Sequence, residues 1–353
     1  MQMKRRFAAI KGDGTIEVME GEVRAPGENE ALVEVEASLI SAGTEMGGVK
    51  NRRLRPNPAA PVSEFGYQNA GVIAGLGAGC EGLKVGQRVA CMGIKGAAPH
   101  GTHGVTPRNL CFSIPDSMSF EEAAFNHLAA TALQAIRRAE LQIGEYVAVV
   151  GQGVVGQIAC QLASICGCRV IAMDQLPMRL EVAKRCGSDL AVNTAEGDPV
   201  EAVRQFTQGN GLDAAIMAFG GDGSAAFQML LKMMMRSPDT HQMGRIVVVG
   251  GCIIQAMYAA AAGNIDLRSS ARTGPGFLDP EWEHGKDYPH VFIRWNTRRN
   301  VQLCLDLIAA GRLQVKPLIT HRFPLSRAPE ACEELISHPD RSLGVILQMK
   351  EGA

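Results

Sequence analysis

The sequence predicts an α/β protein in which a doubly wound parallel sheet is joined to a β-rich region. Three observations support this fold class. Apolar strand-like runs alternate with helical patterns from Tyr146 to about Gly251, which is typical of a parallel sheet. Residues 1–125 carry short alternating runs punctuated by glycines, which favours β structure. The chain has 353 residues, enough for two domains of roughly 150 residues each.

In the first region, residues 30–37 alternate apolar and acidic side chains, which predicts a half-exposed strand. Further strands are predicted at 70–76 and 84–90. Residues 50–61 are rich in basic residues and proline, and we interpret them as a surface loop. Ser119 begins a helix that is expected to run to about residue 138, because Glu122 three residues later completes a capping box.

A glycine motif stands at the centre of the second region. Gly151-Gln-Gly-Val-Val-Gly156 follows an apolar strand at 146–150 and opens a helical pattern. Gly151 permits a tight turn, Gly153 permits a pyrophosphate to approach the backbone, and Gly156 permits close packing of helix and strand. The helix N-terminus, with Val154 and Val155 in its first turn, offers free N–H groups to phosphates. The alternative is a glycine turn in a βαβ unit without a ligand.

A second apolar run, 169–173, ends on Asp174, which lies 23 residues after Gly151. A ribose-binding acid is expected about 20 residues after such a motif. Its carboxylate would accept hydrogen bonds from the ribose hydroxyls and repel a 2′-phosphate, so NAD is predicted over NADP. Arg179 leaves NADP open, since an arginine just past this position can pair with a 2′-phosphate.

Further strands are predicted at 189–193, 213–218 and 245–249, and the last of these could pair across a dimer. Ligands bind at the carboxyl ends of parallel strands. Ala218, Gly250 and Gly251 are therefore candidate cofactor contacts, although glycines also punctuate ordinary turns.

The remainder of the chain is less regular. Residues 252–296 are predicted to be irregular and hold both tryptophans; residues 300–310 form a helix ended by Gly311. The tail is expected to return to the first region. The predicted domains are thus 1–125 with 297–353, and 126–296.

Composition excludes several classes of partner. The net charge of −1 gives no case for nucleic acid or an anionic membrane, and no run of 18 apolar residues predicts a membrane span. The basic N-terminus lacks a following apolar segment, so no signal peptide is predicted. Ten scattered cysteines without a CxxC pair indicate a cytoplasmic protein with reduced thiols.

Several landmarks together resemble the medium-chain dehydrogenase/reductase superfamily across essentially the whole chain. They are Lys84-Val-Gly-Gln-Arg-Val, Ile114-Pro-Asp, Ala123-Ala-Phe with Thr131-Ala-Leu, and the glycine motif. The resemblance implies a Rossmann cofactor domain and a GroES-like β-rich catalytic domain.

The zinc branch of that superfamily has three metal-ligand positions, and this sequence departs at each of them. Ala42 stands at the cysteine, Tyr67 at the histidine and His127 at the third position. Gln68 replaces the glutamate that follows the histidine. Zinc needs about three protein ligands in an open site, so the sequence predicts no metal and a zinc-free member.

A narrower resemblance is to the dehydrogenase half of two-part oxidoreductases that occur with sugar-modifying genes. It is carried by Leu39-Ile-Ser-Ala-Gly-Thr-Glu45, Gly274-Pro-Gly, Asp287-Tyr-Pro and Arg294-Trp with Arg299-Asn300. It implies a sugar or cyclitol substrate.

Without zinc, side chains must polarise the substrate oxygen and move its proton. The resemblance places Tyr67 as a hydroxyl donor, His127 as a proton shuttle and Thr44 at the proton-relay position. Glu45 and Gln68 are expected to orient these groups or bind substrate hydroxyls. The alternatives are a core tyrosine and a buried structural histidine.

Four residues outside this group are candidates for a polar substrate cleft, or for a packing segment between domains. They are Asp287, Tyr288, Arg294 and Trp295. Four further histidines are interpreted as loop residues: His100, His103, His284 and His290.

The sequence therefore predicts an NAD-dependent, zinc-independent dehydrogenase acting on a secondary alcohol or ketone of a sugar, cyclitol or polyol. It is expected to form a homodimer or homotetramer. Two alternatives stay open. One is an enoyl- or quinone-type reductase, a group that usually prefers NADPH, and the other is a non-catalytic NAD-binding protein.

Overall fold

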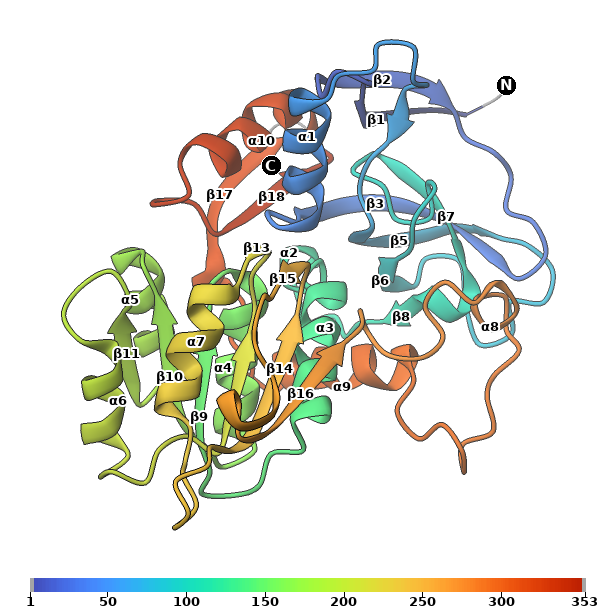
Figure 1. The fold of residues 1–353 in the computed structure, drawn as a ribbon. Coiled ribbons are helices and arrows are strands. Elements are labelled where there is room, and N and C mark those ends of the chain that lie inside the picture. Colours follow the sequence, from blue (N-terminus) through green and yellow to red (C-terminus); the bar gives the residue numbers. More distant parts are fainter. Residues whose placement is uncertain (1–2, 351–353) are drawn as a thin grey trace. The chain divides into compact units, whose positions relative to one another are not determined.

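The chain forms two compact units in this computed structural model, which describes residues 3–350 (Figure 1). Unit 1 holds the chain up to Ala130, Thr273–Gly311, and the chain from Ile319 onward. Unit 2 holds Thr131–Arg272 and Arg312–Leu318. These bounds differ from the predicted domains, because residues 126–130 and 273–296 group with unit 1 and residues 312–318 with unit 2.

Unit 2 is built on a six-stranded sheet with the order β11-β10-β9-β12-β14-β16, in which every pair is parallel. The strand order changes direction between β9 and β12, where such sheets bind ligands. The strands are β9 (Tyr146–Val150), β10 (Arg169–Asp174), β11 (Leu190–Asn193), β12 (Ala214–Met217), β14 (Met243–Val249) and β16 (Asn264–Ser270). The predicted doubly wound α/β fold is thus confirmed.

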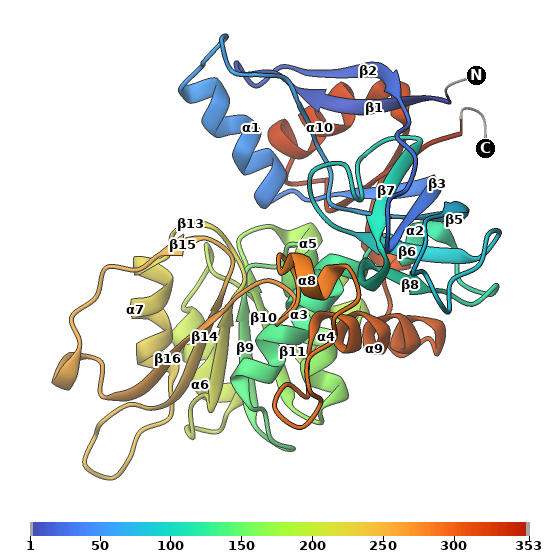
Figure 2. The same cartoon turned by 90° about the vertical axis from the view of Figure 1, so that its right-hand side faces the viewer.

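Helices cover both faces of this sheet. Ala148 and Val150 of β9 join a core cluster with residues of α6 and α7, whereas Val147 and Val149 point to the other face and are also buried. Figures 1 and 2 show α4 and α7 on opposite sides of the sheet. The helices are α4 (Val154–Ile165), α5 (Pro177–Arg185), α6 (Pro199–Phe206) and α7 (Ser224–Met233), with most of α3 (Asn126–Ala139).

The segment 252–296, predicted to be irregular, contains an additional strand. Asn264–Ser270 is β16, and it pairs with β14 along its whole length. Strand β14 therefore has neighbours on both sides, so the prediction that 245–249 pairs across a dimer is wrong. Short elements precede β16: β13 (Gly221–Asp222) pairs with β15 (Cys252–Ile253), and η2 (Ala259–Ala261) follows.

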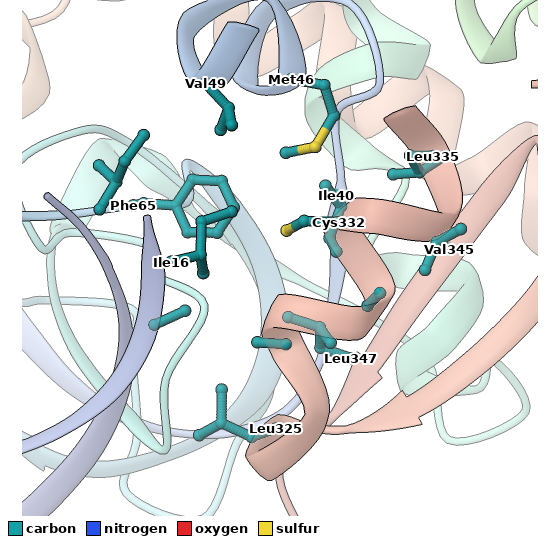
Figure 3. Close-up of a cluster of buried hydrophobic side chains, with 14 of the residues drawn as sticks. Ile16, Ile40, Met46, Val49, Phe65, Leu325, Cys332, Leu335, Val345 and Leu347 are labelled. Atoms are coloured by element: carbon teal, nitrogen blue, oxygen red, sulfur yellow. The ribbon is translucent and has the colours of Figure 1, made fainter. Parts of the chain in front are cut away.

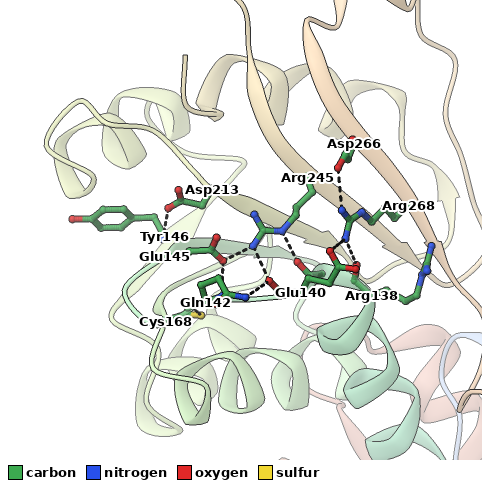
Figure 4. A network of polar contacts seen from close by, with 11 residues as sticks. Arg138, Glu140, Gln142, Glu145, Tyr146, Cys168, Asp213, Arg245, Asp266 and Arg268 are labelled. Atoms are coloured by element: carbon green, nitrogen blue, oxygen red, sulfur yellow. Dashed lines mark hydrogen bonds and ion pairs between the residues drawn. The ribbon is translucent and has the colours of Figure 1, made fainter. Parts of the chain in front are cut away.

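Charged side chains tie together the amino ends of β9, β14 and β16 (Figure 4). Arg245 forms an ion pair with Glu145, and Arg268 pairs with Glu140 at 2.8 Å and Asp266 at 3.0 Å. This network lies at the opposite end of the strands from the glycine motif. We therefore interpret these ion pairs as structural contacts that fix the end of α3 to the sheet.

Unit 1 is mainly antiparallel. A seven-stranded sheet has the order β17-β18-β3-β5-β6-β8, with β7 also paired to β3, and a smaller sheet has the order β2-β1-β4. The strands are β1 (Lys4–Ile10), β2 (Ile16–Glu22), β3 (Glu30–Ile40), β4 (Ser63–Glu64), β5 (Gln68–Leu76), β6 (Arg88–Met92), β7 (His103–Pro107), β8 (Cys111–Ser113), β17 (Ile319–Pro324) and β18 (Gly344–Gln348).

A core cluster joins the beginning and end of the chain within unit 1. Ile16, Ile40 and Phe65 pack with Leu325 and Leu347, as Figure 3 shows. Burial of side chains this large stabilises the native state by roughly 1.5–3 kcal/mol each. The tail is thus part of the same core as the first strands, since β18 pairs with β3.

The helices of unit 1 correct two predictions. The helix expected from Ser119 to residue 138 is two helices, α2 (Phe120–Ala123) and α3, although the capping box is present. The expected loop 50–61 begins within α1 (Thr44–Leu54). The other helical elements of this unit are η1 (Arg108–Leu110), α8 (Pro280–Glu283), α9 (Thr297–Ala309), η4 (Leu325–Arg327) and α10 (Ala328–Ser337). The helix η3 (Lys316–Leu318) lies in unit 2.

Specific contacts explain why 273–296 groups with unit 1. Trp282 is buried, and its carbonyl accepts a hydrogen bond from Asn109 Nδ2 at 2.5 Å. The hydroxyls of Thr273 and Thr297 are 2.9 Å apart, and Asn300 Nδ2 donates to the Thr273 carbonyl. Among residues 3–350, no helix is long and apolar enough to cross a bilayer.

Candidate active site

The glycine motif forms the turn between β9 and α4. Gly151 has φ of +91°, and a Cβ at Gly156 would lie 1.8 Å from the Gly151 carbonyl oxygen, so both positions require glycine. A Cβ at Gly153 would have no neighbour within 4 Å. Gly151 and Gly156 are therefore required by the turn itself, whereas the space beside Gly153 is available to a ligand.

The first turn of α4 faces this opening. Gly153 is the N-cap and supplies no side-chain cap, so the N–H groups of Val154 and Val155 are available to an anion. A helix of 12 residues presents the positive end of its dipole here. The backbone therefore fits the pyrophosphate of a dinucleotide.

Asp174 ends β10 beside the turn. Its Oδ2 accepts a hydrogen bond from Gln152 N at 2.6 Å, and its Oδ1 accepts one from Leu176 N at 2.9 Å. Arg179 is half-buried on α5; burial lowers the pKa of its guanidinium, and the Asp174 carboxylate raises it. The carboxylate is thus fixed at the position expected for a ribose-binding acid, with the arginine near enough to interact with it.

The other predicted cofactor residues lie at the carboxyl ends of β12 and β14. Ala218 N donates to Val150 O at 2.8 Å. Gly250 has φ of +104°, and its Cβ would lie 3.1 Å from the Phe219 carbonyl oxygen. A Cβ at Gly251 would meet no atom within 4 Å. Unit 2 therefore brings the predicted cofactor residues to the same edge of its sheet.

In unit 1, Tyr67 and His127 lie side by side. Their ring centroids are 4.6 Å apart at 57°, and Phe277 packs edge-on against His127 at 5.1 Å. Tyr67 is 9% exposed and His127 is 8% exposed. The two residues that the resemblance places at metal-ligand positions are thus in contact within an aromatic cluster.

The Ser41 and Thr44 side chains lie close enough to the Tyr67 hydroxyl to act on its pKa. Burial raises the pKa of Tyr67 well above its usual value, and the Glu45 carboxylate raises it further, whereas the two hydroxyl contacts lower it. Tyr67 therefore stays a neutral phenol that can donate a hydrogen bond.

Glu45 and His100 form a buried pair behind Tyr67. Glu45 Oε2 accepts a hydrogen bond from Ser41 N at 2.7 Å and lies 3.2 Å from His100 Nε2. His100 lies in the loop between β6 and β7 as predicted, but its side chain is fully buried and its Nδ1 is bonded with Ser38 Oγ at 2.8 Å. The loop prediction is wrong for His103, which is the first residue of β7.

Of the two roles expected for Gln68, its contacts favour orienting its neighbours over binding substrate hydroxyls. Its side chain is 1% exposed, its Nε2 donates to Leu39 O, and its Oε1 accepts from Leu128 N. Since both ends of the amide are engaged, Gln68 joins β3 to the start of α3. It holds its neighbour Tyr67 and His127 in place instead of meeting substrate hydroxyls.

The four candidates in 287–295 divide into two pairs. Asp287 Oδ1 accepts hydrogen bonds from Trp282 Nε1 and Tyr288 N. The Tyr288 hydroxyl donates to Asp279, the N-cap residue of α8. Arg294 and Trp295 are exposed, with the guanidinium 4.9 Å from the indole centroid. The first pair shapes the loop, and the second is exposed at the surface of unit 1.

Comparison with known proteins relates the chain to dehydrogenases. Residues 154–282 match the family described as zinc-binding dehydrogenase. The sorbitol dehydrogenase of Bacillus subtilis (strain 168) is 27% identical over 346 residues, which cover 90% of each chain.

Two solved structures share the fold. A putative zinc-binding dehydrogenase from Sinorhizobium meliloti 1021, bound to NADP, has a TM-score of 0.78 at 19% identity, covering 98% of this chain and 100% of that one. An alcohol dehydrogenase from Escherichia coli CFT073, complexed with NADH, has a TM-score of 0.75 at 18% identity, covering 98% and 99%. The likeness confirms the predicted fold class.

The residues of this chain do not fit the zinc that this family name implies. Among residues 3–350, no group of three or more His, Cys, Asp or Glu side chains is arranged to hold a metal. Cys91 and Cys111 face each other across β6 and β8 with their Sγ atoms 3.9 Å apart, and both are buried. Two sulfur ligands do not make a structural zinc site, which takes four ligands.

Sequence reasoning missed Phe277, His100, Ser38 and Ser41. Their roles depend on contacts between segments far apart in the chain, and a lone histidine or serine in a loop carries no local signal. Phe277 directly follows Gly274-Pro-Gly, a motif that carries part of the resemblance to sugar-related oxidoreductases.

Proposed function

We propose that the protein is an NAD-dependent, zinc-independent oxidoreductase acting on a secondary alcohol or ketone of a sugar, cyclitol or related polyol. The observation that carries the proposal is the contact of Tyr67 with His127, at 4.6 Å, at the positions where the resemblance expects metal ligands. The open glycine turn at Gly153 supports a dinucleotide cofactor. Similarity to a sorbitol dehydrogenase supports a polyol substrate.

The side chains of unit 1 supply what zinc would otherwise provide. A bound nicotinamide would take up hydride from the carbinol carbon in oxidation and return it in reduction. Tyr67, held as a neutral phenol, donates a hydrogen bond to the substrate oxygen and polarises it. His127 takes the proton of the substrate hydroxyl in oxidation and returns it in reduction. Thr44 acts on the Tyr67 hydroxyl and orients it, and the proton stays on His127 until the reverse step or exchange with solvent.

Cofactor preference is assigned to Asp174. Its fixed carboxylate would bind the two ribose hydroxyls and repel a 2′-phosphate, which supports NAD. We include a weaker affinity for NADP in the proposal, because the Arg179 guanidinium interacts with the Asp174 carboxylate and could pair with a 2′-phosphate placed there.

Substrate binding is assigned to Arg294 and Trp295. Arg294 can donate to hydroxyls, and the exposed indole of Trp295 offers an apolar face to a sugar ring. Asp287 and Tyr288 contribute by fixing the loop that carries this pair.

Three measurements on purified protein test the proposal. Metal analysis should find no stoichiometric zinc, and fluorescence titration should find tighter binding of NADH than of NADPH. A sugar and cyclitol panel followed by NADH absorbance should then identify a substrate. Stoichiometric zinc, or no NADH binding, contradicts the proposal. Turnover of enones with NADPH would favour a C=C reductase, and binding without any turnover would favour a non-catalytic protein.

Assembly is proposed to be a homodimer or homotetramer. Strand β16 supports this, because it ends the sheet of unit 2 and leaves one edge for a second copy. Light scattering during size-exclusion chromatography tests it, and a monomer at micromolar concentration would exclude it.

A further inference from the structure

A continuous line of buried polar groups in unit 1 leads from Ser38 to Tyr67. Ser38 is bonded with His100 Nδ1, His100 Nε2 meets Glu45 Oε2, and Ser41 N donates to that same oxygen. The Ser41 and Thr44 side chains in turn lie beside the Tyr67 hydroxyl and act on its pKa. The mechanism proposed above uses only the last part of this line.

The imidazole in this line is fixed from every side. Both ring nitrogens of His100 are hydrogen-bonded, and Phe65 packs edge-on against the ring at 4.8 Å. The backbone N–H of His100 donates to Phe65 O. A Cβ at Gly66 would lie 2.3 Å from His100 N, so the chain just before Tyr67 runs directly against His100.

One oxygen of the Glu45 carboxylate accepts no hydrogen bond from the described residues. The Glu45 side chain is 6% exposed, and its Oε1 is buried with no hydrogen-bond partner among the described residues. A buried carboxylate oxygen without a partner costs free energy, so its retention requires an explanation. Burial is the main cause that raises the pKa of Tyr67 and the pKa of Cys332 on α10, and the charge of Glu45 raises both further.

We propose that Glu45 and His100 are positioning residues, a buried acid–imidazole pair that keeps the Tyr67 hydroxyl oriented as a hydrogen-bond donor toward the substrate oxygen. The catalytic part of this statement rests on the proposed function. Ser41 and Thr44 hold the phenol oxygen, the Glu45 charge opposes formation of a phenolate, and His100 holds Glu45 in place. The competing explanation is that Glu45 only stabilises the first turn of α1, where an acid is favourable.

A titration that needs neither cofactor nor substrate separates these explanations. Phenolate absorbance is followed as pH rises in the wild type, Glu45→Gln and His100→Gln, with Tyr67→Phe subtracted to isolate one of the four tyrosines. Removing the charge in Glu45→Gln should lower the Tyr67 midpoint by about 1 unit or more, the usual size of a like-charge effect. His100→Gln should lower it less.

Glu30→Gln is the matched control. Glu30 is also a largely buried acid of unit 1 that accepts a backbone N–H, from Gly27, and its side chain is 11% exposed. It is bonded with Arg24, and it does not act on Tyr67. Its substitution should leave the Tyr67 midpoint unchanged. Equal midpoints in the wild type and Glu45→Gln, or an equal shift in Glu30→Gln, overturn the proposal.

Kinetics with an identified substrate provide the second measurement. Glu45→Gln and His100→Gln should lower kcat about tenfold or more with a smaller change in KM, since the loss is at the reacting oxygen. Unchanged kcat in folded variants overturns the positioning role. If Glu45→Gln does not fold, Ser38→Ala loosens the ring and keeps the charge, and it should lower kcat without moving the midpoint. A shifted midpoint without turnover of any substrate counts against the proposed function alone.

Discussion

Replacing Asp174 with alanine should change the cofactor preference of the protein. The carboxylate accepts two backbone N–H groups, from Gln152 and Leu176, so it is held rigidly beside the glycine turn. Hydrogen bonds from ribose hydroxyls to this charge would contribute about 2 kcal/mol, or about 30-fold in the Kd of NADH. NADPH keeps only the 3′-hydroxyl and so loses fewer such bonds, and it is freed from repulsion between its 2′-phosphate and the carboxylate.

The assay is a fluorescence titration of NADH and NADPH with the wild type and Asp174→Ala. The ratio of the two Kd values is the informative quantity, because loss of the two backbone bonds disturbs the turn for both cofactors. Asp189→Ala is the control, since Asp189 accepts Val170 N at the other end of β10. The ratio should move at least about 30-fold toward NADPH in Asp174→Ala only. An unchanged ratio in folded Asp174→Ala would refute the assignment.

Three further predictions concern the two units separately. Tyr67→Phe should lower kcat about 100-fold in the NADH absorbance assay, as loss of an oxyanion donor does, whereas the exposed Tyr258→Phe should not change it. Gly156→Ala should lower the free energy of unfolding in urea by more than about 3 kcal/mol, because its Cβ would lie 1.8 Å from Gly151 O. Gly153→Ala, whose Cβ would have no neighbour within 4 Å, should leave the free energy of unfolding unchanged and weaken NADH binding. Stability should fall as pH rises above about 10, because burial raises the pKa of Tyr67 in the folded state above its usual value and only the unfolded state ionises there. Urea unfolding at pH values from about 9 to about 11.5 should show a shallower fall in Tyr67→Phe, and equal slopes would contradict the prediction.

The cofactor edge could be predicted because its signal is local. Gly151, Gly153 and Gly156 stand within six residues, and each glycine meets a steric requirement of one turn. The strands around it are buried on both faces, so their apolar runs were evident in the sequence. Strand β16 was missed because only Ile265 and Leu267 alternate in it, at the edge of the sheet.

The cluster that we propose as catalytic could be predicted only in part. Tyr67 and His127 were found from the positions of lost metal ligands, and their contact agrees with that expectation. Phe277 and His100 could not be found, since each reaches the cluster through pairings between distant segments. Gln68 was assigned to the substrate from its place in a motif, and the sequence could not show that β3 and α3 would occupy both ends of its amide.

The pairing of β18 with β3 has a consequence for how the chain folds as it is synthesised. Val345 pairs with Ile40, a separation of 305 residues, so residues 37–40 of β3 stay without this partner until nearly all of the polypeptide has left the ribosome. The parallel sheet of unit 2 draws its strands from one nearly continuous stretch and can assemble earlier. At roughly 5–20 residues per second, that interval exposes an apolar strand edge for many seconds. Ribosome-bound chains stalled before residue 344 should therefore bind holdase chaperones and aggregate when released, with unit 2 already protected from proteolysis.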